Sequence, residues 1–161
     1  MVRQGQDAAP ALRCSVPALS HVLIRHLDIE IRTGARGTHD LTAQVQAAVA
    51  ESGLKDGLCQ LFCRHTSASL MLCENADPDV RHDLETFMQQ LVPDGDPMFR
   101  HVAEGPDDMP AHVRTLVTQS SLSLPVRNGQ CALGTWQGVY LWEHRQSGHR
   151  RQVVVTLLGD G

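Results

Sequence analysis

The sequence predicts one α+β domain, a sandwich built on a mostly antiparallel or mixed sheet with about three helices. Strand-like runs follow one another, and amphipathic helices interrupt them without the strict alternation of a parallel β-α-β fold. The length of 161 residues and the apolar content of 42% suit one domain with an ordinary core. We expect residues 1–18, which show little periodicity, to be a flexible tail and residues 19–161 to form the domain.

The strands are predicted from alternating apolar and polar residues, or from short apolar runs rich in strand formers. Pro125 marks an edge strand, and the Asn128-Gly129 pair favours a tight hairpin turn. Residues 33–39 are rich in glycine and polar side chains, which indicates a loop. The predicted strands are 23–32, 58–64, 68–73, 122–126, 131–135, 137–144 and 151–158.

Three helices are predicted from apolar residues that recur every three or four positions. Asp40 can cap the first helix, which Gly53 ends. Asp77 can cap the second, with Pro78 at its first helical position. The third runs from residue 109 or 110 to about residue 118.

Composition excludes several classes of protein. No run of about 18 apolar residues exists, which excludes a membrane-spanning helix, and no secretory signal is visible at the N-terminus. A net charge of −4, one lysine and few aromatic residues do not fit a nucleic-acid-binding surface. The five cysteines form no Cys-x-x-Cys pair, so we expect buried, reduced thiols in a cytoplasmic protein.

Charge is unevenly distributed along the chain. Ten acidic residues and only two arginines lie between Glu74 and Asp108, whereas histidines and arginines gather between His144 and Arg151. An acidic cluster attracts a divalent cation, and a basic cluster attracts a phosphate or carboxylate. A solvated helix face and a basic loop would give the same pattern, so both interpretations stay open.

Polar residues beyond the ends of two predicted strands form the first candidate site. His65, Thr66 and Ser67 end one apolar run, and Glu74 and Asp77 follow the next. Small hydroxyls and free backbone amides in a turn can hold a phosphate. The His65 ring is either a ligand or acid–base group, or a buried ring satisfied by a backbone carbonyl.

A second candidate site is a set of histidines. His101 and His112 flank an acidic loop at residues 104–108, and two imidazoles with carboxylates suit zinc, manganese or a similar ion. His144, at the far end of a strand, is a candidate third nitrogen ligand; surface histidines are the alternative interpretation. A Gly-x-Ser-x-Gly elbow, a P-loop and a Gly-x-Gly-x-x-Gly fingerprint are absent from the sequence.

These segments closely resemble the YjbQ family, also called the secondary thiamine-phosphate synthase family, over roughly residues 20–159. The resemblance implies a compact α+β domain that assembles as a homotrimer, with a bound metal or anion. It also implies an activity, which is formation of thiamine phosphate from a pyrimidine pyrophosphate and a thiazole phosphate. The motifs are His65-Thr-Ser-Ala-Ser-Leu, Glu74-Asn-x-Asp77-Pro, Glu104-Gly-x-Asp107-Asp108-Met-Pro-x-His112, Ser121-Leu-x-Leu-Pro125, and Leu133-Gly-Thr-Trp-Gln-Gly with Glu143-His144-Arg145.

The sequence and the resemblance together assign three roles. We expect a divalent metal ion, zinc or magnesium, and a small phosphate ligand as the partners besides further copies of the chain. A metal-dependent hydrolase of unknown substrate and a non-enzymatic metal- or small-molecule-binding trimer are the alternatives. The expected catalytic residues are His65, Glu74, Asp77 and Glu104, the expected anion-binding residues are Thr66, Ser67 and Arg145, and the expected metal ligands are His101, His112 and His144.

Overall fold

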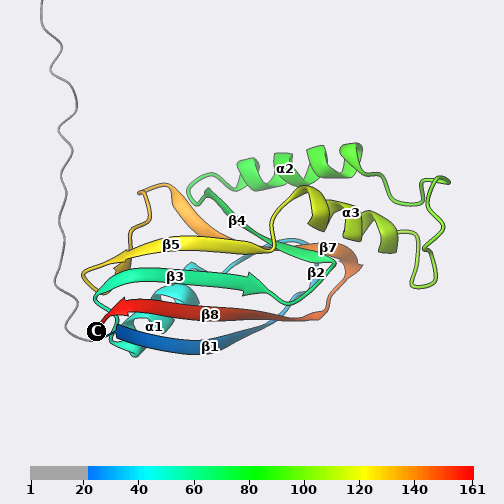
Figure 1. Ribbon diagram of the computed structural model, residues 1–161. Helices are drawn as coiled ribbons and strands as arrows, with labels where there is room; N and C mark the ends of the chain where they lie inside the picture. Colours follow the sequence, from blue (N-terminus) through cyan, green and yellow to red (C-terminus); the bar gives the residue numbers. More distant parts are fainter. Residues whose placement is uncertain (1–21) are drawn as a thin grey trace, which may run out of the picture.

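The computed structural model describes residues 22–161, which form eight strands and three helices (Figure 1). The tail predicted at residues 1–18 therefore lies outside the described residues. None of the described helices is long and apolar enough to cross a membrane. The elements in chain order are β1 (Val22–Arg32), β2 (Ala35–Asp40), α1 (Thr42–Ser52), β3 (Asp56–Cys63), β4 (Ala68–Glu74), α2 (Pro78–Leu91), α3 (Asp108–Val117), β5 (Ser121–Arg127), β6 (Gln130–Cys131), β7 (Gln137–Ser147) and β8 (Arg150–Asp160).

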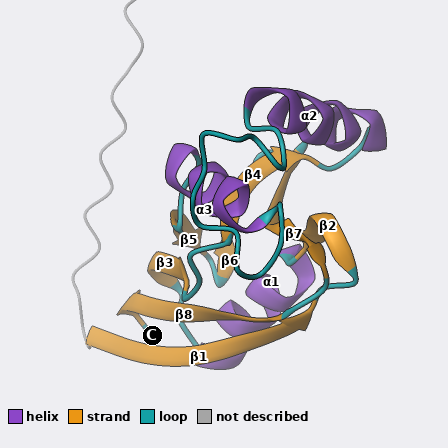
Figure 2. Ribbon diagram, turned by 90° about the vertical axis from the view of Figure 1, so that its right-hand side faces the viewer, coloured by secondary structure: helices purple, strands orange, loops and turns teal. Residues whose placement is uncertain are grey.

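The strands form two sheets, and the pairings within the described chain are antiparallel. The larger sheet has the order β1-β8-β3-β5-β6, and the smaller has the order β2-β7-β4. Helices α2 and α3 lie together at one end of the molecule, with β1 at the opposite end (Figures 1 and 2). The predicted α+β sandwich is confirmed, and its sheets are antiparallel.

The main core lies between the two sheets and includes the buried face of α1. Strand β8 shows how the sequence builds it, since Val153, Val155 and Leu157 are buried and alternate with half-exposed residues. Strand β7 contributes Val139 and Leu141 from the smaller sheet. Burying such a side chain contributes roughly 1.5–3 kcal/mol each, so this layer stabilises the base on which the site stands.

A second, smaller core covers the other face of the smaller sheet. Tyr140 and Trp142 alternate with the main-core residues of β7, so they point to the opposite face and pack with Met71, Met88 and Val92. Helix α2 supplies Met88, while Val113 of α3 packs against the edge of the cluster. This packing fixes α2 and α3 against the sheet that carries the Glu143-His144-Arg145 motif.

Several local signals are confirmed. The Asp77 carboxylate accepts a hydrogen bond from the Asp79 amide at 2.9 Å and so caps α2. Gly53 ends α1 in the left-handed conformation with φ of 79°. Asn128 and Gly129, with φ of 51° and 74°, make the expected hairpin turn.

One loop prediction and one strand prediction are wrong. The loop predicted at 33–39 is mostly strand β2. Its sequence is polar because β2 is an edge strand, and its pairing with β7, which the sequence does not show, defines it. The strand predicted at 131–135 is only the two-residue β6. The chain turns directly after it, where the Leu133 amide donates to the Cys131 carbonyl at 2.8 Å.

The cysteines of the described chain carry free thiols. Cys59, Cys63 and Cys131 are buried, and Cys73 is half-buried. This agrees with the expectation of buried, reduced thiols, while Cys14 lies outside the described residues. The cytoplasmic location inferred from them stays a prediction.

Candidate functional site

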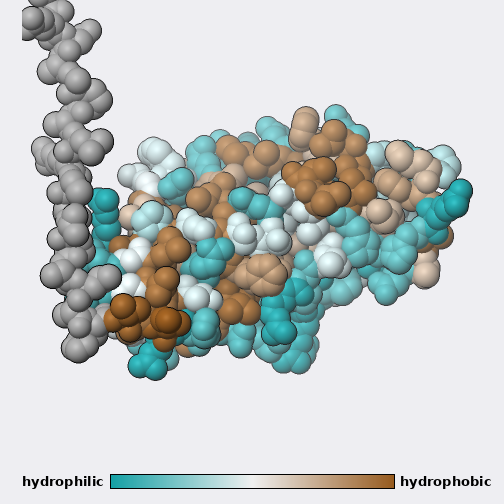
Figure 3. Space-filling model, viewed as in Figure 1, coloured by the Kyte–Doolittle hydropathy of each residue, from teal (hydrophilic) through white to brown (hydrophobic). Residues whose placement is uncertain are grey.

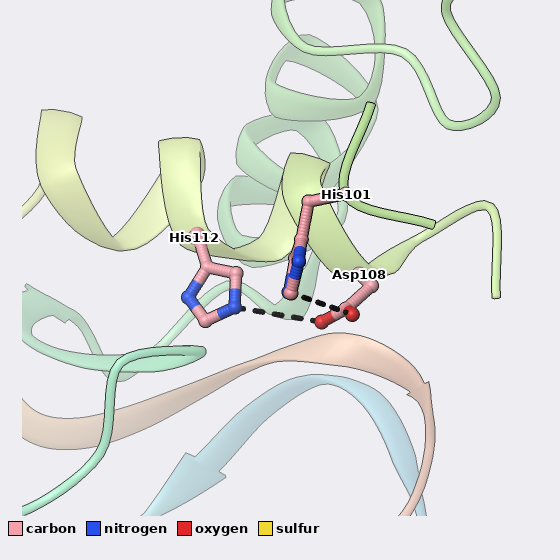
Figure 4. A group of neighbouring side chains, drawn as sticks. All are labelled: His101, Asp108 and His112. Atoms are coloured by element: carbon pink, nitrogen blue, oxygen red, sulfur yellow. Dashed lines mark ion pairs between the residues drawn. The ribbon is translucent and has the colours of Figure 1, made fainter. Parts of the chain in front are cut away.

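Helix α3 and the loop before it bring together three side chains of types that can hold a metal ion (Figure 4). Asp108 and His112 are four residues apart, which places them on one face of the helix. His112 Nε2 lies 3.5 Å from Asp108 Oδ1, and His101 Nε2 lies 3.0 Å from Asp108 Oδ2. The ligand atoms of the three residues are all within 4.8 Å of one another.

The orientation of the His112 ring suits a metal ligand. Its Nδ1 lies 2.9 Å from the Thr66 carbonyl oxygen, which can only accept, so Nδ1 carries the hydrogen. In the neutral ring the lone pair is then on Nε2, the atom that faces Asp108. Metal-binding histidines usually donate their other ring N–H in this way, which fixes the ring and raises its basicity.

The donor set fits zinc better than magnesium. Ligand atoms around a tetrahedral zinc lie about 3.3 Å apart, since each bond is about 2.0–2.1 Å long. The two histidines approach different oxygens of Asp108, at 3.0 and 3.5 Å, and with one ligand atom from each residue the three atoms lie within 4.8 Å of one another. Imidazole nitrogens suit zinc and similar transition ions, whereas magnesium prefers oxygen ligands. Three protein ligands would also leave a position open for a substrate oxygen.

Arg145, predicted to bind an anion, is turned toward carboxylates. Its Nε donates to Asp107 at 3.0 Å, and its Nη1 donates to Glu104 at 3.0 Å and to Asp108 at 3.2 Å. Its Nη2 donates to the Glu104 backbone carbonyl at 2.9 Å. All three nitrogens are therefore engaged, and the side chain fixes the position of Asp108.

The same contacts act on the neighbouring acids. Burial alone would raise the pKa of Asp107, but hydrogen bonds from the Gln146 amide and from Arg145 hold that pKa below its usual value. Glu104, predicted to be catalytic, has an exposed side chain paired with Arg145. Its carboxylate shares Arg145 Nη1 with Asp108 and so lies beside the candidate metal group.

His144 is not brought to His101 and His112. It is fully buried on β7, its Nε2 lies 2.9 Å from the Ser69 hydroxyl, and its ring packs against Trp142. Burial and the nearby Arg114 charge lower its pKa to about 3, so the ring is neutral. Since Ser69 is buried and His144 Nδ1 has no hydrogen-bond partner within residues 22–161, this pair lacks the features of a serine hydrolase.

Strand β8 fixes the turn that carries His65, Thr66 and Ser67. The Gln152 amide donates to His65 Nε2 at 2.8 Å. Arg151 Nη2 donates to the Ser67 hydroxyl at 3.1 Å and to the Ser67 carbonyl at 3.2 Å. The hydroxyl expected to hold a phosphate is thus already bound to Arg151.

Arg151 itself is anchored by a buried carboxylate. It pairs with Glu143, which is fully buried and also accepts from the Thr33 hydroxyl at 2.8 Å. Burial would raise the pKa of Glu143, but the hydrogen bonds from Arg151, the Arg145 amide and Thr33 hold it below its usual value. The ion pair of Arg151 with Glu143 therefore links β7, β8 and the turn at 65–67.

A pocket of about 920 Å³ lies between α3 and the turn at 64–66. Its apolar lining residues include Phe62, Met109, Val113 and Leu116, and its polar lining residues include His112. The polar side chains that line it are hydroxyls, an amide, Arg64 and the two histidines, with no carboxylate among the lining residues described. A site of this composition favours an anionic ligand with an apolar body.

Glu74 and Asp77 lie elsewhere, at the junction of β4 and α2. Asp77 caps α2, and the Glu74 carbonyl accepts from Arg81 at 2.8 Å. Neither residue lines the pocket, so the structure separates them from His112. The expected metal set omitted Asp108, although its spacing of four residues from His112 on a predicted helix was a signal for it.

Fold and site together define a class, an antiparallel α+β sandwich in which two histidines and an aspartate come together and one of them, His112, lines an open pocket. The model of the family described as UPF0047 protein YjbQ-like matches residues 27–160. The chain therefore belongs to the YjbQ (UPF0047) family.

Relatives and solved structures agree with this assignment. A UPF0047 protein of Synechocystis is 52% identical over 130 residues, which is 81% of this chain and 88% of the relative. The YjbQ protein of Escherichia coli O157:H7 is 44% identical over 78% of this chain and 91% of its own. A crystal structure of a YbjQ-like protein of unknown function from Sulfolobus solfataricus has a TM-score of 0.80 at 26% identity, covering 87% of this chain and all of that one. The comparisons identify a family and a fold, and they do not name a reaction.

Proposed function

We propose that this chain is a metal-dependent enzyme that acts on small phosphate compounds, and that it forms thiamine phosphate. The observation that carries the proposal is the His101–Asp108–His112 group, whose His112 lines the pocket and is oriented by the Thr66 carbonyl. The particular reaction comes from the resemblance to the YjbQ family. Its chemistry is compatible with the groups that line the pocket.

The reaction requires stabilisation of negative charge on the leaving group and requires little proton transfer. The thiazole nitrogen donates its lone pair to the pyrimidine methylene, and the bond from that methylene to a pyrophosphate oxygen breaks. Negative charge therefore gathers on the leaving pyrophosphate. A divalent ion, when bound, supplies positive charge to those oxygens.

The residues of this chain have distinct tasks in such a reaction. His101, Asp108 and His112 would hold the ion. Arg145 keeps Asp108 in place through the contact at 3.2 Å. The apolar side chains of Val113 and Leu116 would contact the ring of the ligand.

The first experiment measures metal content and synthesis in the same preparations. Untagged protein, His112→Ala and a His82→Ala control on exposed α2 would be compared for bound zinc and for thiamine phosphate made from the two precursors. We expect His112→Ala to lose bound metal and to make product on the order of a hundredfold more slowly. His82→Ala should match the wild-type protein.

Two other results would change the assignment. Equal metal content and equal rate in His112→Ala would contradict the metal site. Bound metal with release of inorganic phosphate from phosphate esters, and no thiamine phosphate, would instead favour a metal-dependent hydrolase.

We also propose, from the family resemblance, that the chain assembles as a homotrimer. Apolar side chains gather in the region of α2 and α3 on the face drawn in Figure 3. On α3, Leu116 is 83% exposed and Val117 is also exposed. Exposed apolar surface of this kind often marks a contact between proteins. The pocket opens beside the same side chains, so an assembly through them would also shape the ligand site.

A further inference from the structure

His65 and His112 line the same pocket but present opposite chemistry to it. His112 uses its hydrogen on the Thr66 carbonyl and keeps a lone pair for a cation. His65 does the reverse, because its Nε2 accepts the Gln152 amide at 2.8 Å. A neutral imidazole has one hydrogen, so in His65 that hydrogen is on Nδ1.

The pairing of β3 with β8 fixes this tautomer. The two strands pair up to Cys63 and Val153, and the Arg64 amide then donates to the Gln152 carbonyl at 3.1 Å. The next donor of β8 is the Gln152 amide, and the His65 ring takes the place of a backbone acceptor. A backbone N–H group can only donate a hydrogen bond, so His65 Nε2 must carry the lone pair that accepts it.

The hydrogen on His65 Nδ1 is free for a ligand. No group within residues 22–161 accepts a hydrogen bond from it, and Nδ1 is not among the buried polar atoms that lack a partner, so solvent reaches it. Burial and the Arg151 charge lower the pKa of His65, which keeps the ring neutral at pH 7. Arg64 and Thr66 flank the ring, and the pocket lining lacks a carboxylate that would compete for the hydrogen.

We propose that His65 is an anion-binding residue that donates its Nδ1 hydrogen to a phosphoryl oxygen of the ligand. The ligand is then held at two points, by His65 through a hydrogen bond and at His112 through a metal ion. This inference rests on the proposed function and gives His65 a role in recognition, in place of a role as a general base or a metal ligand.

Two substitutions separate the two nitrogens of the ring. The amide of His65→Gln can reach the position of Nε2 and accept the Gln152 amide, but it leaves no donor at the position of Nδ1. The amide of His65→Asn places a donor near Nδ1 and gives up the contact with Gln152. Binding of inorganic phosphate, pyrophosphate and acetate would be measured by calorimetry on metal-free and zinc-loaded protein.

We expect His65→Gln to weaken phosphate and pyrophosphate binding about tenfold or more, the size expected for a hydrogen bond to a charged group. His65→Asn should stay within about threefold of the wild-type protein. Equal phosphate binding by His65→Gln and the wild-type protein would overturn the inference. Tighter binding of acetate than of phosphate would overturn the phosphoryl assignment.

A spectroscopic measurement tests the tautomer directly. A long-range ¹H–¹⁵N correlation spectrum of the wild-type protein should show His65 protonated at Nδ1 only. Protonation at Nε2 would overturn the inference whatever the binding data show. The metal-free measurements keep the two proposals apart, since loss of phosphate binding in His65→Gln supports the role of His65 even if His112→Ala shows that no metal is held.

Discussion

At the scale of single residues, the contacts of His65, His112 and His144 give the three rings different hydrogen-bonding arrangements. His112 donates at Nδ1 to Thr66, His65 accepts at Nε2 from Gln152, and His144 is fully buried beside Ser69. The sequence identified all three as candidates because of their residue type and position. It did not reveal their states, because each partner is more than 40 positions away along the chain.

The buried His144 should make stability depend on pH. Its pKa is about 3 in the folded protein and near 6.5 when unfolded, so between these values the unfolded chain binds a proton that the folded chain does not. Stability should therefore fall as pH falls, by about 2 kcal/mol between pH 6.5 and about pH 4.5. Urea unfolding across this range measures the effect.

His144→Gln is the matched variant for that measurement. Its amide can still bond to the Ser69 hydroxyl, but it does not titrate, so its free energy of unfolding should vary less with pH than that of the wild-type protein. The acidic groups of the chain contribute equally to both proteins. Parallel pH dependences would show that His144 carries no such linkage.

At the scale of elements, the sequence predicted where the helices lie along the chain, but it did not predict which other segments their ends contact. The Asp108 and His112 positions were within reach of sequence reasoning because one helical turn relates them. The contact of His112 with Thr66 was not, since it requires α3 to lie across the end of β3. The edge strand β2 was missed for the same reason, because pairing with β7 defines it.

Two glycines test how local geometry is encoded in the strands. A Cβ on Gly57 would lie 2.2 Å from the Leu158 carbonyl oxygen, so Gly57→Ala must separate β3 from β8 and should cost about 3 kcal/mol or more. A Cβ on Gly129 meets no close neighbour, and only its left-handed φ of 74° opposes a side chain. Gly129→Ala should therefore cost about 1–2 kcal/mol.

Urea unfolding of the two variants checks this order, and zinc binding by Gly129→Ala supplies a control, because the turn at 128–129 is remote from the candidate metal group. A smaller cost for Gly57→Ala than for Gly129→Ala would contradict the close approach of the two strands.

At the scale of the whole molecule, alternation along the strands was enough to predict a sandwich, and the resemblance to the YjbQ family placed it among known folds. The arrangement of the two sheets was not predicted. Strand β7 faces one core through Leu141 and another through Trp142, and a run of apolar residues does not show which neighbour lies on which side. The position of Arg145 against three acids follows from that same arrangement.

The proposed homotrimer gives the last prediction. If α3 forms the contact, light scattering should give a mass near three times the 17.7 kDa of the chain. Leu116→Asp should lower that mass to one chain, because the carboxylate would be buried without a partner in the contact. Its cost to the isolated fold should be small, since Leu116 is 83% exposed.

Leu91→Asp, at an exposed apolar position of α2, is the matched control and should keep the trimer. A wild-type mass of one chain would contradict the assembly, and an unchanged mass for Leu116→Asp would contradict a contact through α3.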